Sequence, residues 1–324
     1  MKKVLEAIYE PRFLNCMYGF RPNRGCHGAV KELYKRLNFT KICYIVDADI
    51  KGFFDHMKHD WIMKFLNLYI KDPNILWLVN KYLKAGVMDE GKLVENEEGS
   101  AQGNIISPIL ANIYMHNVLT LWYKFIIAKE SRGENFLIVY ADDFIAGFQY
   151  KWEAEKYYKL LKERMEKFGL ELEESRSRML ESGGYLAKSK QKRGESTRLE
   201  TFDFLGFTFY CGQTRKGTAW MMPKTSSKKF RQKLKDIKVW LYANRDQKLK
   251  KLMGMLNLKL TGHYRYYGVS FNGRMISNFK QQVREMLFKV LNRRSNRKSY
   301  TREGFIEMLK YYPLVMPKIY VSLF

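Results

Sequence analysis

Apolar residues recur at helical spacing in many segments of the chain. Between Ala29 and Leu37 they fall on one face of a helix. The same spacing predicts further helices at residues 59–68, 75–83, 152–168, 246–267, 273–294 and 301–311. The clearest stripe follows Ser226, where lysines and arginines occupy the remaining faces. It consists of Phe230, Leu234, Ile237 and Leu241.

Short apolar runs bounded by turn residues predict strands. Residues 42–48 form one run that ends at Asp49. Residues 136–140 and 144–148 are separated by Ala-Asp-Asp, which is typical of a strand, turn and strand. A further apolar hairpin is expected at 202–209, behind a Lys/Arg-rich loop at 188–198, and a hairpin or loop at 86–100. Antiparallel hairpins combined with long helices indicate an α+β fold.

The apolar stretch from Ile105 to Ala128 is a candidate membrane span by hydropathy alone. It contains Pro108, Asn112 and Lys124, so we expect a buried helix instead. Lys2 and Lys3 are followed by Glu6 and Glu10 in the first ten residues, where a signal peptide would have an apolar run. The four cysteines are widely spaced and include no CxxC pair, which fits a reducing compartment. We therefore expect a cytoplasmic protein without membrane contact.

Positive charge is concentrated in the C-terminal part of the chain. The formal net charge is +25, and residues 188–324 hold 31 lysines and arginines against 8 acidic residues. A surface that only keeps the protein soluble would not need so one-sided a distribution of charge. Binding to a polyanionic partner would explain it. An anionic membrane is the weaker alternative because aromatic and basic residues are interleaved rather than segregated. Nucleic acid is the expected partner.

Two groups of acidic residues end apolar strands. Asp47, Asp49 and Asp55 surround the end of the first strand, and Asp142 and Asp143 occupy the tip of a hairpin. A lone Asp-Asp pair is more often an ordinary polar turn. Here a second acid-tipped strand favours a site where cations neutralise the carboxylates. Hard oxygen ligands indicate two Mg²⁺ ions, with Mn²⁺ as a substitute, in the arrangement that serves phosphoryl transfer.

The order of these motifs resembles that of group II intron reverse transcriptases and maturases. The matching segments are residues 18–30 (YGFRPNRGCHGAV), 49–55 (DIKGFFD), 101–114 (AQGNIISPILANIY), 140–143 (YADD), 169–176 (GLELEESR), 202–209 (FDFLGFTF), 263–268 (HYRYYG) and 292–295 (NRRS). The resemblance implies a right-hand polymerase, with an antiparallel palm sheet, partial fingers and an all-α thumb. It places the partial fingers at 1–40, the palm at 41–224 and the thumb, similar to maturase domain X, at 225–324.

The resemblance also implies roles for particular residues. Asp49, Asp142 and Asp143 would be catalytic, and together with Ile50 they would form the metal site. Phe54 would stand as a steric gate under the incoming sugar, beside Gln102 and Gly103 in the nucleotide pocket. Arg176 stands where the family commonly has a lysine that protonates pyrophosphate. A guanidinium does not readily give up a proton, so its expected role is electrostatic. Nucleic acid would be held by Arg21, Arg24, Lys228, Lys229, Arg231, Arg293 and Arg294.

The leading hypothesis is RNA-templated DNA synthesis from a DNA or RNA primer with deoxynucleoside triphosphates, combined with help to intron splicing. A maturase-like splicing cofactor that binds intron RNA without catalysis is the alternative. A truncated remnant of a mobile element is the third, because the chain begins after the family's N-terminal finger region and stops before any DNA-binding or endonuclease domain.

Overall fold

A computed structural model describes residues 1–84, 87–89, 92–94, 99, 105–293 and 300–324. The chain forms two compact units. The first comprises residues 1–200 and 211–221, and the second comprises 201–210 and 222–324. The chain passes between the units in the irregular segment at residues 200–201 and within two strands, β8 (Phe207–Gln213) and β9 (Ala219–Thr225). The hairpin at 202–209, which the sequence placed in the palm, belongs mainly to the second unit.

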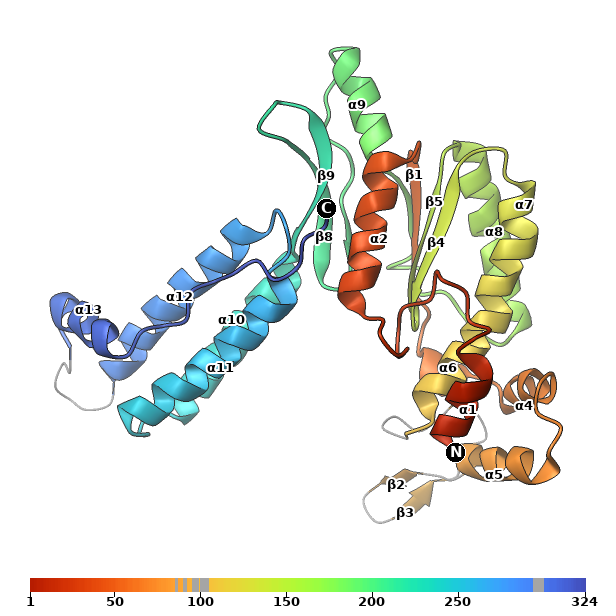
Figure 1. Ribbon diagram of the computed structural model, residues 1–324, viewed down its shortest axis with the longest axis horizontal. Helices are drawn as coiled ribbons and strands as arrows, with labels where there is room; N and C mark the ends of the chain where they lie inside the picture. Colours follow the sequence, from red (N-terminus) through yellow and green to blue (C-terminus); the bar gives the residue numbers. More distant parts are fainter. Residues whose placement is uncertain (85–86, 90–91, 95–98, 100–104, 294–299) are drawn as a thin grey trace. The chain divides into compact units, whose positions relative to one another are not determined.

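The first unit is built on a sheet of four antiparallel strands in the order β4-β5-β1-β6 (Figure 1). They are β1 (Tyr44–Ala48), β4 (Asn135–Tyr140), β5 (Asp143–Phe148) and β6 (Arg178–Glu181). Their side chains alternate between the two faces of the sheet. Val46, Ala146 and Leu137 share one face and enter the main hydrophobic core.

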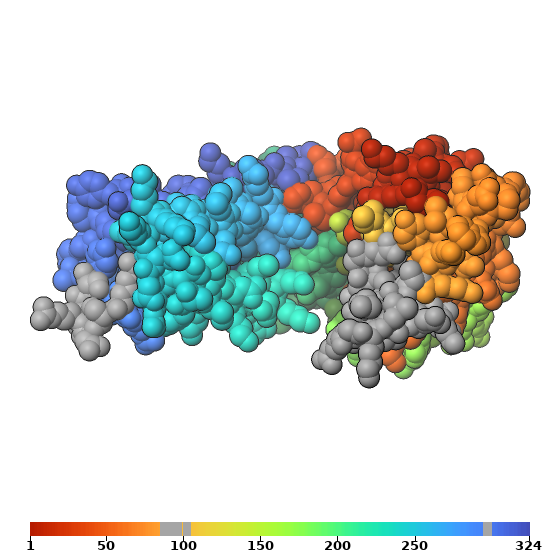
Figure 2. Space-filling view, turned by 90° about the horizontal axis from the view of Figure 1, so that it is seen from below, coloured from red at the N-terminus to blue at the C-terminus, as the bar shows by residue number. Residues whose placement is uncertain are grey.

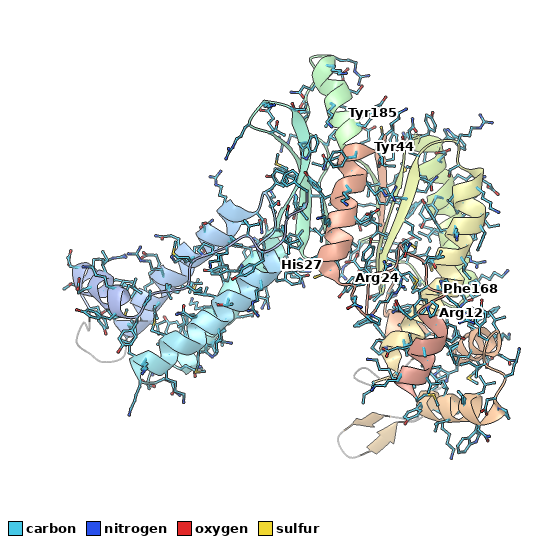
Figure 3. The ribbon with its side chains drawn as sticks, in the orientation of Figure 1. Arg12, Arg24, His27, Tyr44, Phe168 and Tyr185 are labelled. Carbon is cyan, nitrogen blue, oxygen red and sulfur yellow. The ribbon has the colours of Figure 1, made fainter. Side chains whose placement is uncertain are left out.

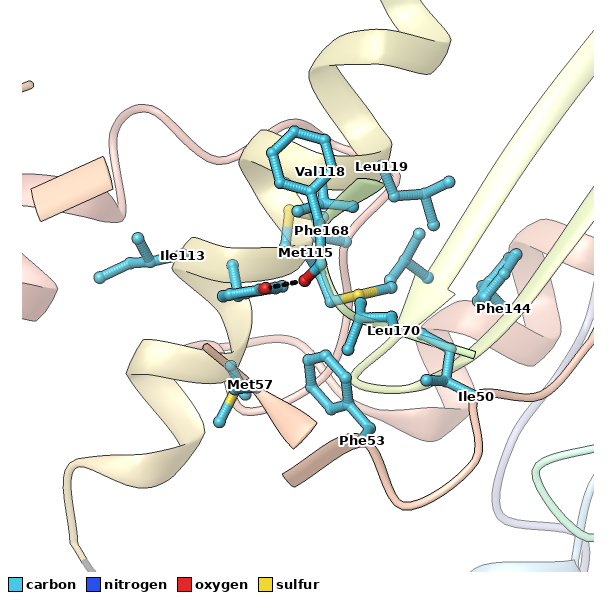
Figure 4. Packing of buried hydrophobic residues seen from close by; sticks show 14 of the residues in the cluster. Ile50, Phe53, Met57, Ile113, Met115, Val118, Leu119, Phe144, Phe168 and Leu170 are labelled. Carbon is cyan, nitrogen blue, oxygen red and sulfur yellow. Dashed lines mark hydrogen bonds between the residues drawn. The ribbon is translucent and has the colours of Figure 1, made fainter. Parts of the chain in front are cut away.

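Helices supply the rest of this core. They are α1 (Lys2–Tyr9), α3 (Phe53–His56), α4 (His59–Asn67), α5 (Pro73–Lys84), α6 (Ser107–Met115) and α8 (Lys151–Lys167). The segment after α6 continues through two π-helical turns, η1 (His116–Thr120) and η2 (Tyr123–Ile127), into α7 (Ala128–Glu130). Figure 4 shows Ile50, Phe53 and Phe144 among the buried residues of this core. Tyr114 donates a hydrogen bond to the Phe168 carbonyl in the same core.

The other face of the sheet carries α2 (Cys26–Phe39), as the apolar spacing at 29–37 predicted. Gly147 lies under the ring of Phe136, and a Cβ there would stand 2.1 Å from a ring carbon. Only glycine fits below this ring.

Surface elements complete the first unit. In Figure 2, α1 (red) and α4–α5 (orange) lie side by side, and the Tyr9 hydroxyl donates to the Phe65 carbonyl between them. A short hairpin pairs β2 (Val87–Asp89) with β3 (Lys92–Val94), as expected for residues 86–100. Part of the predicted loop at 188–198 is instead a helix, α9 (Gly184–Lys192).

The second unit contains β7 (Phe202–Phe204), which pairs with β8, and four helices. These are α10 (Ser227–Ala243), α11 (Leu249–Tyr267), α12 (Gly273–Leu291) and α13 (Arg302–Tyr311). The buried residues of α10 are those of the predicted stripe. Among the described residues of the whole chain, no helix has the length and apolarity needed to cross a bilayer.

Candidate active site

The Asp-Asp motif sits on a two-residue turn between β4 and β5, in which Tyr140 pairs with Asp143. Ala141 has a φ of 56°, a left-handed conformation that costs a non-glycine residue about 1 kcal/mol. The turn is covered by Gly19, where a Cβ would lie 2.6 Å from the nitrogen of Ala141. The segment before Gly19 pairs with β4, since the Tyr18 amide donates to the Val139 carbonyl. The segment around Tyr18 and Gly19 therefore packs over this turn and holds it in place.

Asp49 directly follows β1 and is held on its far side by residues 171–177. The Glu173 amide donates to the Asp49 carbonyl at 2.8 Å, and the Asp49 amide donates to the Ser177 hydroxyl at 3.2 Å. Because β1 and β5 are neighbours, the end of β1 lies beside the start of β5. Asp49 and the Asp142 turn therefore lie at the same end of the sheet, where β1 finishes and β5 begins.

These residues line one open pocket in the first unit. Its walls are Asp49, Ile50, Lys51, Gly52, Phe53, Phe54, Asp55, Asp142, Glu173 and Arg176. Asp49, Ile50, Phe54, Asp142 and Arg176 were all named from the sequence, and the fold brings them together. Ile50 could bind a metal only through its main-chain carbonyl, because its side chain is apolar and buried.

The electrostatics of the pocket disfavour bare carboxylates. Burial raises the pKa of Asp142, and the nearby Asp49 carboxylate raises it further. Both effects penalise the ionised form, which a bound cation would relieve. Two hard oxygen donors in one polar pocket fit a divalent metal.

Asp143 differs from the other two carboxylates. It opens β5, is half-buried, and is not among the residues that line the pocket. Within the described part of the chain, no three His, Cys, Asp or Glu side chains are arranged to hold a metal. The expected three-carboxylate cluster is therefore present only as the Asp49 and Asp142 pair.

Arg176 already places a cation beside Asp49. Its Nη1 donates to Oδ2 of Asp49 at 3.0 Å, with the arginine side chain 65% exposed. Arg176 reaches this position because the chain turns sharply after Glu173, whose carbonyl accepts from the amides of Arg176 and Ser177. Sequence reasoning missed Glu173 and Ser177, and the only available signal was their closeness to Arg176 in the chain.

The remaining predicted nucleotide contacts divide into two groups. Phe54 lines the pocket next to the buried ring of Phe53, 5.4 Å away between centroids. Gln102 and Gly103 lie outside the described residues.

Arg21 and Arg24 have structural partners near the N-terminus. The Arg21 guanidinium is 4% exposed, forms an ion pair with Glu10 at 2.7 Å and donates to the Leu14 and Met17 carbonyls. This burial argues against the predicted phosphate contact and corrects it to a structural role. Arg24 is half-buried and donates to both the carbonyl and the side chain of Asn15.

The predicted thumb contacts lie on the second unit. Lys228, Lys229 and Arg231 are exposed on α10, around its buried stripe. Arg293 follows α12, is exposed and donates to the Tyr242 hydroxyl at 2.8 Å. Arg294 lies outside the described residues.

Two family models match this chain. Residues 1–209 match the family described as reverse transcriptase (RNA-dependent DNA polymerase), which gives the class of the palm and its acidic pocket. Residues 227–306 match the group II intron maturase-specific domain. The chain belongs to the group II intron reverse transcriptase and maturase family.

Similar curated proteins include intron-encoded ones. The "Uncharacterized 91 kDa protein in cob intron" of Schizosaccharomyces pombe is 42% identical over 36% of this chain and 14% of its own length. The "Group II intron-encoded protein LtrA" of Lactococcus lactis is 41% identical over 38% of this chain and 21% of its own. The alignments thus span a small part of these relatives.

Among solved structures, telomerases align with this chain at low similarity. Apo telomerase from Candida tropicalis aligns with 94% of this chain and 50% of its own, at a TM-score of 0.48 and 15% identity. A form of it truncated from the C-terminal domain covers 68% of this chain, at a TM-score of 0.49.

Proposed function

We propose that the protein is an RNA-directed DNA polymerase of group II intron type. The observation that supports this most strongly is the shared pocket of Asp49 and Asp142, where burial and like charge call for a cation. Its substrates would be an RNA template, a DNA or RNA primer and deoxynucleoside triphosphates.

Asp49, Asp142 and the main-chain carbonyl of Ile50 would hold Mg²⁺, with Asp143 directly after Asp142 in the chain. The bound metals would supply activation of the primer 3′-hydroxyl and charge stabilisation on the leaving pyrophosphate. The exposed guanidinium of Arg176 would attract the triphosphate. Phe54 would exclude a ribose 2′-hydroxyl by its bulk.

Primer extension on an RNA template with Mg²⁺ tests this proposal. Asp142→Asn should reduce the rate by at least about 100-fold, because it removes a charged metal ligand. Glu163→Gln is the matched control, since Glu163 is exposed on α8 and lies outside the pocket. Unchanged synthesis by a folded Asp142→Asn protein would contradict the proposed site.

RNA binding in intron splicing is the second candidate function. The match of residues 227–306 to the maturase-specific domain favours it. In this function the thumb binds intron RNA and the palm serves as a scaffold. Binding and splicing assistance that persist in Asp142→Asn would support it, and their loss in this variant would count against it.

A further inference from the structure

The helix α9 is fixed rigidly on the palm by two glycines. Gly183 has a φ of 154°, and a Cβ there would stand 2.1 Å from the Ile42 carbonyl oxygen. A Cβ on Gly184 would lie 2.8 Å from the Leu37 carbonyl. A side chain at Gly184 would push α9 away from α2, and one at Gly183 would push it away from the segment before β1. The basic segment is therefore a docked element and not a free loop.

The turn between β8 and β9 is attached to the same helix. The Gln191 amide nitrogen donates to the Gly217 carbonyl at 2.7 Å, and its oxygen accepts from the Ala219 amide at 2.9 Å. One side chain thus satisfies two main-chain groups of the turn. It holds Arg215 and Lys216, both exposed in the turn, beside α9.

Aromatic side chains border these basic residues. The Trp220 indole donates to the Tyr34 hydroxyl at 2.9 Å, and Lys188 Nζ stands 4.2 Å from the Trp220 ring centroid. Phe39 meets Trp220 edge-on at 5.5 Å and is nevertheless 66% exposed. Tyr185 on α9 is 47% exposed. Trp220 thus contacts both an exposed ring and a cation.

The basic residues here are largely free to meet a ligand. Lys190 and Arg193 have acidic partners, Glu181 and Glu195. Lys192, Arg215 and Lys216 are exposed and take part in no ion pair with any residue that the structure describes. We call Phe39, Tyr185, Lys192, Arg215 and Lys216 the α9 surface.

The α9 surface lies at the end of the palm sheet opposite to the acidic pocket. Gly183 contacts the residues just before β1, whereas Asp49 follows the last residue of that strand. Five strand residues separate the two ends by roughly 16 Å. Figure 3 shows Tyr185 near Tyr44, which begins β1. An RNA segment on α9 would therefore not occupy the pocket.

We propose that the α9 surface is a second RNA-binding site, which holds an unpaired segment such as a loop. Lys192, Arg215 and Lys216 contact phosphates, while Phe39 and Tyr185 stack on bases that only unpaired RNA exposes. The proposal rests on the proposed action on RNA. It adds a binding site outside the polymerase pocket.

Cross-linking tests the aromatic part. The protein is saturated with a short primer–template duplex, and a 20-nucleotide single-stranded RNA with 4-thiouridine is then added and irradiated. We expect adducts on peptides that contain Phe39 or Tyr185, reduced about tenfold by Phe39→Ala with Tyr185→Ala. Adducts confined to other peptides would overturn the proposal.

Charge substitutions test the proposed contacts with phosphates. Lys192→Gln, Arg215→Gln and Lys216→Gln together should weaken binding of this RNA about tenfold and lower its salt slope by about 2. The control of equal charge is Lys151→Gln, Lys156→Gln and Lys159→Gln, three exposed lysines on α8, of which Lys151 and Lys156 form exposed ion pairs with Glu155 and Glu130. Equal effects of both triple variants would refute a local site. Preference for an acidic peptide over RNA would refute it too.

Primer extension separates this proposal from the polymerase function. The α9 variants should extend a short primer–template at the normal rate. Failure of the unaltered protein to extend would contradict the polymerase proposal only, while loss of extension in the α9 variants would contradict a separate site.

Discussion

At the scale of single residues, Arg176 is the most informative side chain. The sequence indicated an electrostatic role toward pyrophosphate, and the structure adds a direct partner, Asp49. The same guanidinium would therefore compete with a metal for this carboxylate. The pair is exposed to solvent, and exposed ion pairs are weak, so the competition is mild and reversible.

Arg176→Gln should consequently tighten metal binding in the absence of nucleotide. We expect Mn²⁺ affinity to rise about twofold to fivefold, measured from the free-ion signal in electron paramagnetic resonance. Lys51→Gln removes the same charge from the same pocket without touching Asp49, because Lys51 pairs with Glu171. A smaller gain in Mn²⁺ affinity in Lys51→Gln would attribute the effect to the Arg176–Asp49 ion pair. Weaker Mn²⁺ binding in Arg176→Gln would contradict the competition.

At the scale of elements, α11 carries a buried histidine whose ring nitrogens lack partners. His263 stacks on Phe279 with centroids 3.6 Å apart, and neither nitrogen has a hydrogen bond among the described residues. Burial lowers its pKa to about 4. The unfolded chain, with a histidine pKa near 6.5, then binds more protons than the folded one between these values. Stability is full above this window and falls as pH drops through it.

His263→Phe should make the protein less sensitive to acid. The native histidine costs about 2 kcal/mol between pH 7 and pH 5, and phenylalanine keeps the stack without a titrating group. Urea unfolding at both pH values measures the difference. The exposed His56→Phe is the control and should leave the pH dependence unchanged. If His263→Phe and the unaltered protein lost the same free energy of unfolding between pH 7 and pH 5, this explanation would be disproved.

Elements with strong periodicity were predictable, and those fixed by tertiary contacts were not. The stripe of α10 is buried as expected, because one apolar face in a basic helix permits a single orientation. The helix α9 was missed because its sequence is mostly polar and its position depends on Gly183 and Gly184. The strand β9 was also missed because it contains Pro223, which an edge strand tolerates.

The same distinction applies to the site. Strand ends and a hairpin tip located Asp49 and Asp142 from the sequence. The support from Glu173 and Ser177 depends on a turn that returns the chain to Asp49, and no local pattern encodes that return. Burial of Arg21 likewise depends on Glu10, eleven residues away.

At the scale of the whole molecule, charge divides the chain by function. Residues 1–187 are nearly neutral, and residues 188–324 carry almost all of the net charge of +25. The acidic pocket thus belongs to the neutral part, and the basic part begins within α9. The proposed chemistry and the proposed RNA contacts of the thumb thus fall on different stretches of sequence.

This division predicts a measurable effect on salt dependence. Lys228→Gln, Lys229→Gln and Arg231→Gln together should lower the slope of log affinity against log salt by about 2, since each lost phosphate contact removes roughly 0.7–0.9. Fluorescence anisotropy of a labelled intron RNA between low and physiological salt gives the slope. The control Lys151→Gln, Lys156→Gln and Lys159→Gln removes as much charge from α8 in the first unit and should leave the slope nearly unchanged. Screening by salt acts on the overall charge of the protein, whereas counterion release requires direct contact with phosphates. An equal decrease of the salt slope in both variants would therefore show that RNA is bound by the overall positive charge and not by α10.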